Sequence, residues 1–189
     1  MDRLWRDDVE GRATRRNTLK LLSTQSMEFN EHNIEAGYRY ESAAVISDGT
    51  PPTPTPDPIR IYVQDTRPGS PLPHAMLDDA DGNPVPLMNL VRPGRFLLIA
   101  GEDGAAWCEA AIDIARTSGV PLDVVRIGHA DGDYRDPRST WHRYREITGQ
   151  GAILVRPDRF VAWRSKSASP SPAADLRQAL SAVLQRKVA

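Results

Sequence analysis

Residues 149–164 read Gly-Gln-Gly-Ala-Ile-Leu-Val-Arg-Pro-Asp-Arg-Phe-Val-Ala-Trp-Arg. Two runs in this stretch, Ala152–Val155 and Phe160–Trp163, are rich in β-branched and aromatic residues, which favour strands. Between them stand Pro157, whose φ is fixed, and Asp158, whose side chain can accept a hydrogen bond from its own backbone. Proline cannot donate to a strand ladder and belongs in a turn. The stretch therefore predicts a β-hairpin.

A βαβ unit is predicted upstream of this hairpin. Phe96–Ala100 is a near-continuous apolar run, typical of a strand buried on both faces, and Leu122–Ile127 is a second strand. Between them, apolar residues from Trp107 to Ala115 mark one face of a helix, and Gly119 stands where a C-cap glycine is expected. Such a unit favours two parallel strands with a right-handed connection.

Two further helices complete the predicted domain. Thr140–Ile147 reads as a short helix before the hairpin. A last helix begins at Ser171-Pro172, a serine suited to the N-cap followed by proline at the first helical position. The resulting order, β-α-β-α-β-β-α, is the thioredoxin-like arrangement, so the fold class predicted is α/β.

The N-terminal part of the chain has a different pattern. From Thr18 to near Asn33 the apolar residues recur at helical spacing, with Leu19, Leu22 and Phe29 on one face. A helix that carries such a face needs something to cover it. We therefore expect a helical and extended arm over residues 1–50.

Prolines divide the chain. Residues 51–58 contain five prolines and favour a semi-rigid polyproline II linker. Ile59–Val63 then alternates as a strand would. The predicted organisation is an arm at 1–50, a linker at 51–58 and a thioredoxin-like domain at 59–189.

The composition excludes several classes of function. The 189 residues carry a formal net charge of −1, which does not favour binding to nucleic acid or to an anionic membrane. No stretch approaches the roughly 20 apolar residues that a membrane span needs. The start of the chain lacks the apolar core of a signal peptide, and its single cysteine, Cys108, suits a reducing compartment. We expect a cytoplasmic protein.

Cys108 follows a buried strand and opens a predicted helix, where thioredoxins place the first cysteine of their redox motif. The motif here would read Cys108-Glu109-Ala110-Ala111, so the second cysteine is replaced by alanine. Gly151-Ala152 also stands where a thioredoxin has its cis-proline. The sequence therefore predicts a structural thiol and no dithiol chemistry.

The sequence contains no motif typical of a cofactor or metal site. Gly149-Gln150-Gly151 precedes a strand, whereas a dinucleotide fingerprint follows a strand and opens a helix. The turn at 101–104 combines two glycines with two acids, a poor cradle for phosphate. No histidine has a second histidine or the cysteine at zinc-ligand spacing. We predict no catalytic, cofactor-binding or metal-binding residue in this chain; the acidic loop at 129–136 is read as a solvated loop, with weak Ca²⁺ binding left open.

The hairpin is crowded with charge, through Arg156, Asp158, Arg159 and Arg164. One interpretation is an ion-paired turn that also blocks edge pairing of the strand. The other is a docking surface for another domain, with Trp163 as its anchor. Because Trp163 alternates with its neighbours, we expect Trp163 to be largely buried and Arg164 to face the other side.

Four stretches resemble FAD-dependent aromatic-ring hydroxylases of the phenol and 2,4-dichlorophenol hydroxylase type. They are residues 151–164, residues 28–45, Arg67-Pro68-Gly69 with Pro73-His74, and Phe96–Leu98 followed by Trp107. These enzymes end in a thioredoxin-like domain without redox cysteines. The resemblance, together with the charges of the hairpin, singles out nine structural or docking residues: Arg67, Gly69, His74, Trp107, Arg156, Pro157, Asp158, Trp163 and Arg164.

The resemblance implies an ortho-hydroxylation of a phenol, carried out by the complete enzyme with FAD and NAD(P)H. This chain lacks the family's FAD motifs, so it resembles the C-terminal third of such an enzyme and is expected to be inactive alone. Its leading predicted role is structural, stabilising the enzyme or its dimer. The partner would be the flavin and substrate domain or a second copy. The alternatives are a free-standing thiol protein that uses Cys108, or a small non-flavin enzyme that uses His74 or His129.

Overall fold

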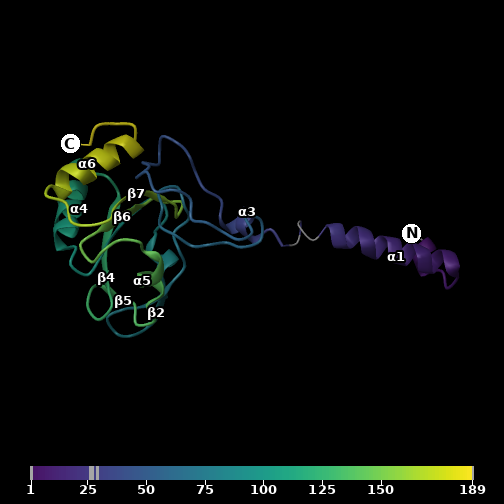
Figure 1. Cartoon of the computed structure of the whole chain (residues 1–189). Helices are drawn as coiled ribbons and strands as arrows, with labels where there is room; N and C mark the ends of the chain where they lie inside the picture. Colours follow the sequence, from purple (N-terminus) through teal and green to yellow (C-terminus); the bar gives the residue numbers. More distant parts are fainter. Residues whose placement is uncertain (1, 26–27, 29, 189) are drawn as a thin grey trace. The chain divides into compact units, whose positions relative to one another are not determined.

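A computed structural model describes residues 2–25, 28 and 30–188 of the chain. The residues cluster into two compact units (Figure 1). The first contains Met1–Gly37 and Thr55–Val63, and the second contains Tyr38–Pro54 and Gln64–Ala189. Residues 38–50, which the sequence grouped with the arm, thus cluster with the second unit, and the proline-rich stretch 51–58 is divided between the two.

The first unit is mainly helical. It contains the 3₁₀ helix η1 (Asp2–Trp5), the helix α1 (Val9–Thr24) and the short helix α3 (His32–Ala36). Asp8 caps α1, because its side chain accepts a hydrogen bond from the N–H of Gly11 at 2.8 Å. The cap explains why the helix begins at Val9, well before the expected Thr18. The helix ends at Thr24, before the expected Asn33.

Gly11 is the only residue of α1 that is buried. The leucines at positions 19, 21 and 22 are between 56% and 66% exposed. Ser26, Met27 and Phe29 of the expected apolar face lie outside the described residues. Among the described residues, no helix is both long and apolar enough to cross a membrane.

The strand expected at Ile59–Val63 does not form. The carboxylate of Asp57 accepts hydrogen bonds from the N–H groups of Ile59 and Arg60, at 2.9 and 3.0 Å. This arrangement closes an Asx-type turn in place of an extended run. Ile61 is 44% exposed. Alternation of apolar residues was therefore a misleading signal here, because this described segment pairs with no strand.

The second unit is built on a mixed seven-stranded sheet with the order β2-β1-β5-β4-β3-β6-β7. β3 pairs in parallel with β4 and β4 with β5, and the other neighbours are antiparallel. The strands are β1 (Met76–Asp78), β2 (Pro84–Pro86), β3 (Phe96–Ala100), β4 (Leu122–Gly128), β5 (Tyr134–Arg135), β6 (Ala152–Val155) and β7 (Val161–Ser165). The helices are η2 (Leu87–Leu90), α4 (Ala105–Ser118), α5 (Thr140–Tyr144) and α6 (Pro172–Val183).

The predicted hairpin is confirmed as β6 and β7, with Pro157 and Asp158 in the turn between them. The strands at 96–100 and 122–128, the helix between them and the last helix are also confirmed. Gly119 ends α4 in the left-handed conformation, with φ of 68°. The sequence missed the three short strands β1, β2 and β5, since a strand of two or three residues is too short for a periodic pattern.

Both faces of the sheet are covered. Along β3, Phe96, Leu98 and Ala100 join one core cluster, whereas Leu97 and Ile99 join the other. The first cluster contains apolar residues of α4 and α6, and the second contains Leu72, Leu77, Leu87 and Trp141. Two-sided burial explains the continuous apolar sequence of β3.

Candidate docking site: a buried arginine network

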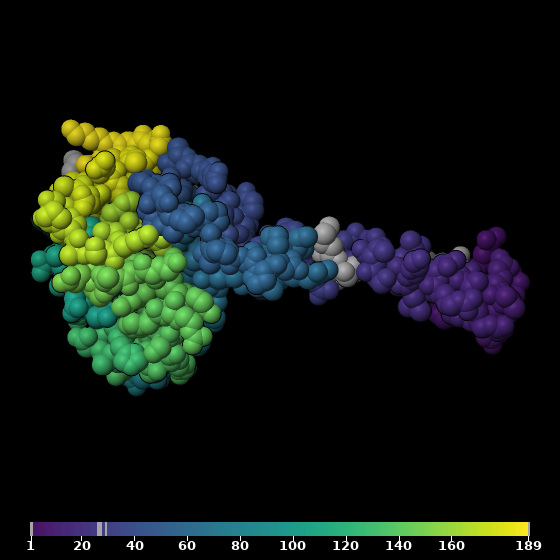
Figure 2. Space-filling view, in the orientation of Figure 1, coloured from purple at the N-terminus to yellow at the C-terminus, as the bar shows by residue number. Residues whose placement is uncertain are grey.

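Residues 38–54 form an irregular segment of the second unit, which we call the strap. In the space-filling view this segment, coloured blue, lies against the yellow-green C-terminal part of the unit (Figure 2). The N–H of Ile46 donates to the carbonyl oxygen of Ala162 in β7 at 2.8 Å. Ala44 and Ile46 pack against the core cluster that contains Trp107. The strap is therefore attached to β7 through both backbone and side chains.

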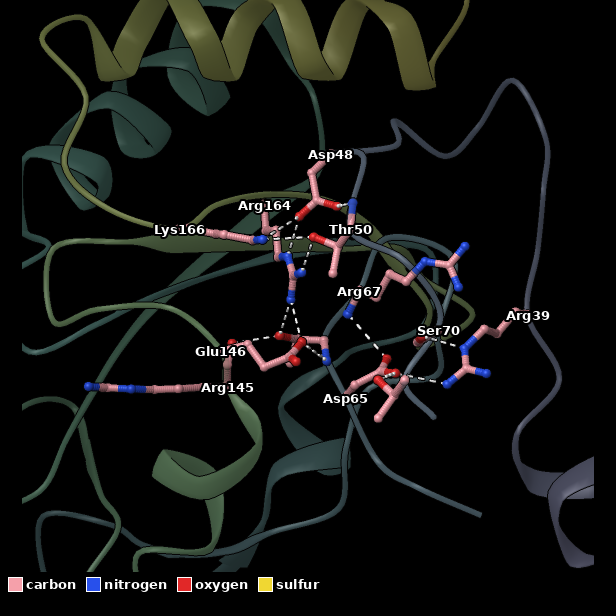
Figure 3. A network of polar contacts seen from close by, with 12 residues as sticks. Arg39, Asp48, Thr50, Asp65, Arg67, Ser70, Arg145, Glu146, Arg164 and Lys166 are labelled. Atoms are coloured by element: carbon pink, nitrogen blue, oxygen red, sulfur yellow. Dashed lines mark hydrogen bonds and ion pairs between the residues drawn. The ribbon is translucent and has the colours of Figure 1, made fainter. Parts of the chain in front are cut away.

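Arg164 of β7 is the centre of this attachment (Figure 3). Its side chain is completely buried and forms ion pairs with Asp48 of the strap at 2.7 Å and with Glu146 at 2.6 Å. Its remaining N–H groups donate to the hydroxyls of Thr50 at 3.0 Å and Thr66 at 2.9 Å. A buried guanidinium requires this degree of pairing, since an unpaired charge in the interior is costly.

The network also stabilises the ionised form of the Asp48 carboxyl. Burial raises the pKa of the Asp48 carboxyl, but hydrogen bonds from Arg164 and Thr50 and the charge of Arg164 outweigh this effect, and its pKa lies at about 2. Lys166 adds a second positive group, 3.7 Å from Asp48. The carboxylate is therefore ionised at neutral pH and available to bind Arg164.

A second cluster joins the strap to the loop at residues 65–70. The buried Asp65 accepts hydrogen bonds from Arg39 at 2.8 Å and from the hydroxyl of Thr53 at 2.6 Å (Figure 3). Gly69 has a φ of 93°, and a Cβ at that position would meet the carbonyl oxygen of Tyr40 at 2.3 Å. Gly69 is therefore required both by its backbone conformation and by the close approach of the strap.

The hairpin turn contacts the strap as well. Arg156 pairs with Asp158 at 2.6 Å, and its guanidinium lies 5.1 Å from the ring centroid of Tyr40. The edge of Tyr40 meets the ring of Phe160 at a centroid distance of 4.5 Å. The charged turn is thus ion-paired, as one of the two interpretations expected, and it also forms a contact surface within the chain.

The two predicted tryptophans meet inside the core. Trp107 is buried, and its indole N–H donates to the carbonyl oxygen of Gln150 at 2.9 Å. Trp163 meets it edge-on, with 5.5 Å between ring centroids. Trp163 is partly exposed and packs against the core cluster of α4 and α6, one of the two places where the sequence expected it to be buried. Arg164 is buried as well, because Asp48 and Thr50 of the strap, together with Thr66 and Glu146, surround its guanidinium.

The structure brings most of the nine predicted residues into one region. Arg67, Gly69, Arg156 and Arg164 surround the strap, whereas His74 lies apart from the network. His74 is exposed and donates only its main-chain N–H, to Gln64 at 2.6 Å, among the contacts of the described residues. Sequence reasoning missed Asp48, Thr50, Thr66 and Glu146, whose separation from Arg164 along the chain leaves no local signal.

Cys108 does not occupy the position of a reactive thiol. α4 begins at Ala105, and the N–H of Cys108 already donates to the carbonyl oxygen of Gly104 at 3.3 Å. Burial, followed by the charge of Asp133, raises the pKa of the Cys108 thiol. The thiolate is therefore disfavoured, and Cys108 behaves as a small core residue.

A titratable cluster lies near the start of α4. Hydrogen bonding from Arg145 holds the pKa of Glu102 at about 2. Nδ1 of His142 lies 2.9 Å from the buried Asp136, which also accepts the N–H groups of Thr140 and His142. Within the described part of the chain, no group of three or more histidine, cysteine or acidic side chains has the arrangement of a metal site. These contacts tie α5 and Arg145 to the segments that follow β3 and β5.

The turn between β3 and α4 does not fit the pyrophosphate of a dinucleotide. Such a site needs unpaired N–H groups at the start of a helix. Here the N–H of Gly101 donates to Gly151 at 3.0 Å and that of Asp103 to Gly149 at 2.8 Å, so the loop before β6 occupies the position. The acids Glu102 and Asp103 would also repel phosphate. No step of flavin chemistry is therefore assigned to these residues.

Comparison with known proteins places these observations in a family. Residues 65–186 match the family described as "Aromatic-ring hydroxylase, C-terminal". The chain is 36% identical over 180 residues to 2,4-dichlorophenol 6-monooxygenase of Cupriavidus pinatubonensis (strain JMP 134 / LMG 1197), covering 94% of this chain and 30% of that protein. It is 37% identical over 171 residues to phenol 2-monooxygenase of Pseudomonas sp. (strain EST1001), covering 89% and 28% respectively.

A solved structure agrees with these sequence matches. The flavin-dependent monooxygenase PieE, in complex with FAD and substrate, superposes with a TM-score of 0.78 at 38% identity. The match covers 98% of this chain and 31% of PieE. The chain therefore spans less than a third of the length of each of these relatives.

Proposed function

Because this chain belongs to the family of C-terminal regions of FAD-dependent aromatic-ring hydroxylases, we propose that it is the redox-inactive, thioredoxin-like C-terminal module of a phenol-type monooxygenase. Its role is structural: it stabilises the enzyme or its assembly. The observation that carries the proposal is the match that covers 98% of this chain and 31% of PieE. The paired N–H groups of the β3–α4 turn, which leave no phosphate cradle there, support it.

The thioredoxin-like part of the proposal rests on topology. β3, α4 and β4 form a parallel βαβ unit, and the hairpin β6–β7 precedes α6. Four neighbouring strands lie in the order β4-β3-β6-β7, which ends at the sheet edge, with β6 antiparallel to β3. The redox-inactive part is supported by Cys108, whose thiol has a raised pKa.

In this proposal the chemistry belongs to other parts of a complete enzyme. FAD would supply the oxygenating chemistry there, with NAD(P)H as the reductant and O₂ as the source of the oxygen atom that hydroxylates a phenol ring. The residues of this chain contribute no catalytic group. Their contribution is mechanical, because Arg164 and Asp65 hold the strap on the module. The enzyme would work in the cytoplasm.

The partner is the flavin and substrate region of such an enzyme, or a second copy of the chain. α1 supports this choice, since it exposes Leu19, Leu21 and Leu22 on a helix that buries only Gly11. Contiguous exposed apolar side chains of this kind mark interaction sites. A covering partner would remove them from water.

A chimaera tests the proposal. Three proteins are compared: PieE, PieE without its matching region, and PieE carrying this chain in place of that region. Bound FAD per chain and the midpoint of thermal unfolding are measured. We expect the chimaera to retain FAD and to unfold at a higher temperature than the truncated protein, because the module covers surfaces that truncation exposes.

A matched pair of variants sharpens the test. Arg164→Met in the chimaera should abolish the rescue, since it releases the strap. Arg116→Met should not, because Arg116 is exposed and, within the described part of the chain, forms its ion pair with Asp113 on the same helix. A chimaera no more stable than the truncated protein would overturn the structural role.

A further inference from the structure

The second unit has a surface pocket of about 490 Å³ between the strap and the loop at residues 65–70. The strap contributes seven lining residues, Arg39, Tyr40, Glu41, Ser42, Val45, Ser47 and Pro52. The loop contributes Arg67 and Pro68. We call this the Arg67 pocket. Its volume suits a small organic molecule.

Arg67 lines this pocket, and its guanidinium is unpaired among the described residues. Its main-chain N–H donates to Asp65 at 3.2 Å, but among the described residues its guanidinium has no hydrogen bond or ion pair. Figure 3 shows the guanidinium of Arg67 directed away from Asp65. The five N–H groups of this half-buried side chain are therefore available to a ligand.

The nearby charges explain why Arg67 stays uncommitted. One oxygen of Asp65 accepts from Arg39 at 2.8 Å and from Thr53 at 2.6 Å. Arg39, the other arginine of the pocket, also donates to the hydroxyl of Ser70 at 3.0 Å. Asp65 and Arg39 thus satisfy each other, and the positive charge of Arg67 remains.

The backbone around Arg67 is held in place. The carbonyl oxygen of Arg67 accepts from the N–H of Ser70 at 2.9 Å, and the N–H of Gly69 donates to Val161 of β7 at 2.8 Å. Tyr40 donates its N–H to the carbonyl oxygen of Gly69 at 2.9 Å. A wall that is already ordered loses little conformational entropy when a ligand binds.

The remaining walls restrict the ligand. Tyr40, Val45, Pro52 and Pro68 offer apolar surface. Glu41 lines the same pocket, and its negative charge opposes a ligand with two or more negative charges. A carboxylate matches the planar fork of a guanidinium through two parallel hydrogen bonds.

We propose that the Arg67 pocket binds a small apolar monocarboxylate, with the carboxylate on the Arg67 guanidinium and the apolar body against Tyr40, Val45 and Pro52. This site is separate from the role of the module in a hydroxylase and does not depend on it. Arg67 binds the carboxylate, and the negative charge of Glu41 disfavours ligands with more than one negative charge.

Titration with benzoate, followed by ¹H–¹⁵N NMR of the whole chain, tests the proposal. Benzoate should bind saturably, with a Kd in the range of about 1 mM that is ordinary for a small ligand held by one ion pair. The shifted amides should fall in residues 39–52 and 67–69. Benzamide, which has the same shape without the charge, should not saturate.

Two variants separate Arg67 from general charge effects. Arg67→Met keeps the apolar stem and should weaken benzoate binding about tenfold or more, as expected for loss of a charged hydrogen-bond donor. Arg143→Met removes the same charge at an exposed arginine outside the pocket and should leave the Kd unchanged. The thermal midpoint of each variant checks that both fold.

The proposal is overturned if benzoate produces no saturable shifts, if benzamide binds equally well, or if the shifts lie outside the pocket. Equal affinity in folded Arg67→Met also overturns it. Saturable binding of inorganic phosphate with none of benzoate would exclude the apolar monocarboxylate. If Arg67→Met does not fold, the comparison of benzoate with benzamide on the wild-type chain decides the matter.

Discussion

At the scale of single residues, the most informative feature is the buried charge of Arg164 in β7. Arg164 lies inside the protein and joins β7 to the strap, to Glu146 and to the 65–70 loop. A buried arginine is a weak source of net stability compared with an apolar side chain that packs as well. Removing it alone, however, leaves its carboxylate partners without a counter-charge.

Arg164→Met should lower the free energy of unfolding by about 3–5 kcal/mol, the range observed when one partner of a buried ion pair is removed. Urea denaturation measures this. The control is Arg116→Met, whose side chain is 74% exposed and whose loss should stay within about 0.5 kcal/mol. A loss in Arg164→Met no larger than in the control would mean that the network contributes nothing to stability.

The pH dependence of stability should report the carboxylate of Asp48. Its pKa is lowered from 3.8 to about 2, so its contribution is complete above pH 3.8 and is lost as pH falls through about 2. The free energy of unfolding should therefore fall between about pH 4 and pH 2. Urea denaturation at several pH values in this window measures the slope.

Asp48→Asn should flatten that slope, because amide and carboxylate differ in protonation but not in shape. Some slope should remain, since the pKa of Glu102 is also lowered to about 2, from 4.5. Asp81→Asn, at an exposed position, serves as the control and should keep the wild-type slope. An unchanged slope in Asp48→Asn would contradict the assignment.

At the scale of elements, the hairpin β6–β7 has two different faces. Trp163 packs against the core cluster of α4 and α6, and Arg164 binds the strap. The two contacts follow from the alternation of side chains along a strand. The hairpin therefore serves both the core and the attachment of the strap.

Trp163→Ala should cost about 3 kcal/mol, the lower end of the range for core tryptophans, because Trp163 is only half-buried. Denaturation at two protein concentrations should give the same loss, since core packing does not depend on association. Trp5→Ala is the control, as Trp5 is 85% exposed. A loss that grows at lower protein concentration would instead place Trp163 at an interface.

Hydrogen exchange should distinguish α1 from the strap. α1 buries only Gly11, and an isolated helix is marginal in water, so its amides should exchange quickly. The amides of Tyr40 and Ile46 donate to Gly69 and Ala162 and should exchange slowly, as should those of β3 and β6. Equal protection of α1 and β3 in a demonstrated monomer would contradict this prediction.

At the scale of the whole molecule, the chain is expected to bind no FAD by itself. The N–H groups of the β3–α4 turn donate to Gly149 and Gly151 and are not available to phosphate. The purified chain, mixed with FAD and passed through a desalting column, should show no flavin absorbance. PieE, which is known in complex with FAD, is the positive control. Flavin recovered with the chain in stoichiometric amount would disprove the expectation.

The sequence by itself determined the α/β core and the family. Continuous apolar strands, a glycine that ends α4 and a proline-containing turn are local signals, because each depends on residues that are neighbours along the chain. Arg67, Gly69 and Arg164 were singled out for the same reason, within short motifs. Their roles were not visible, since a motif names residues but not their distant partners.

Only the tertiary structure decided which charges are buried and what binds them. Asp48 and Arg164 lie 116 positions apart along the chain, and the sequence offers no periodicity that connects them. The position of the strap on β7 cannot be inferred from its own sequence, because the network that holds it also includes the loop at 65–70 and Glu146. Whether a charged side chain is buried depends on all the groups that surround it in space. Arg164 is therefore fully buried, whereas its neighbour Trp163 is half-buried.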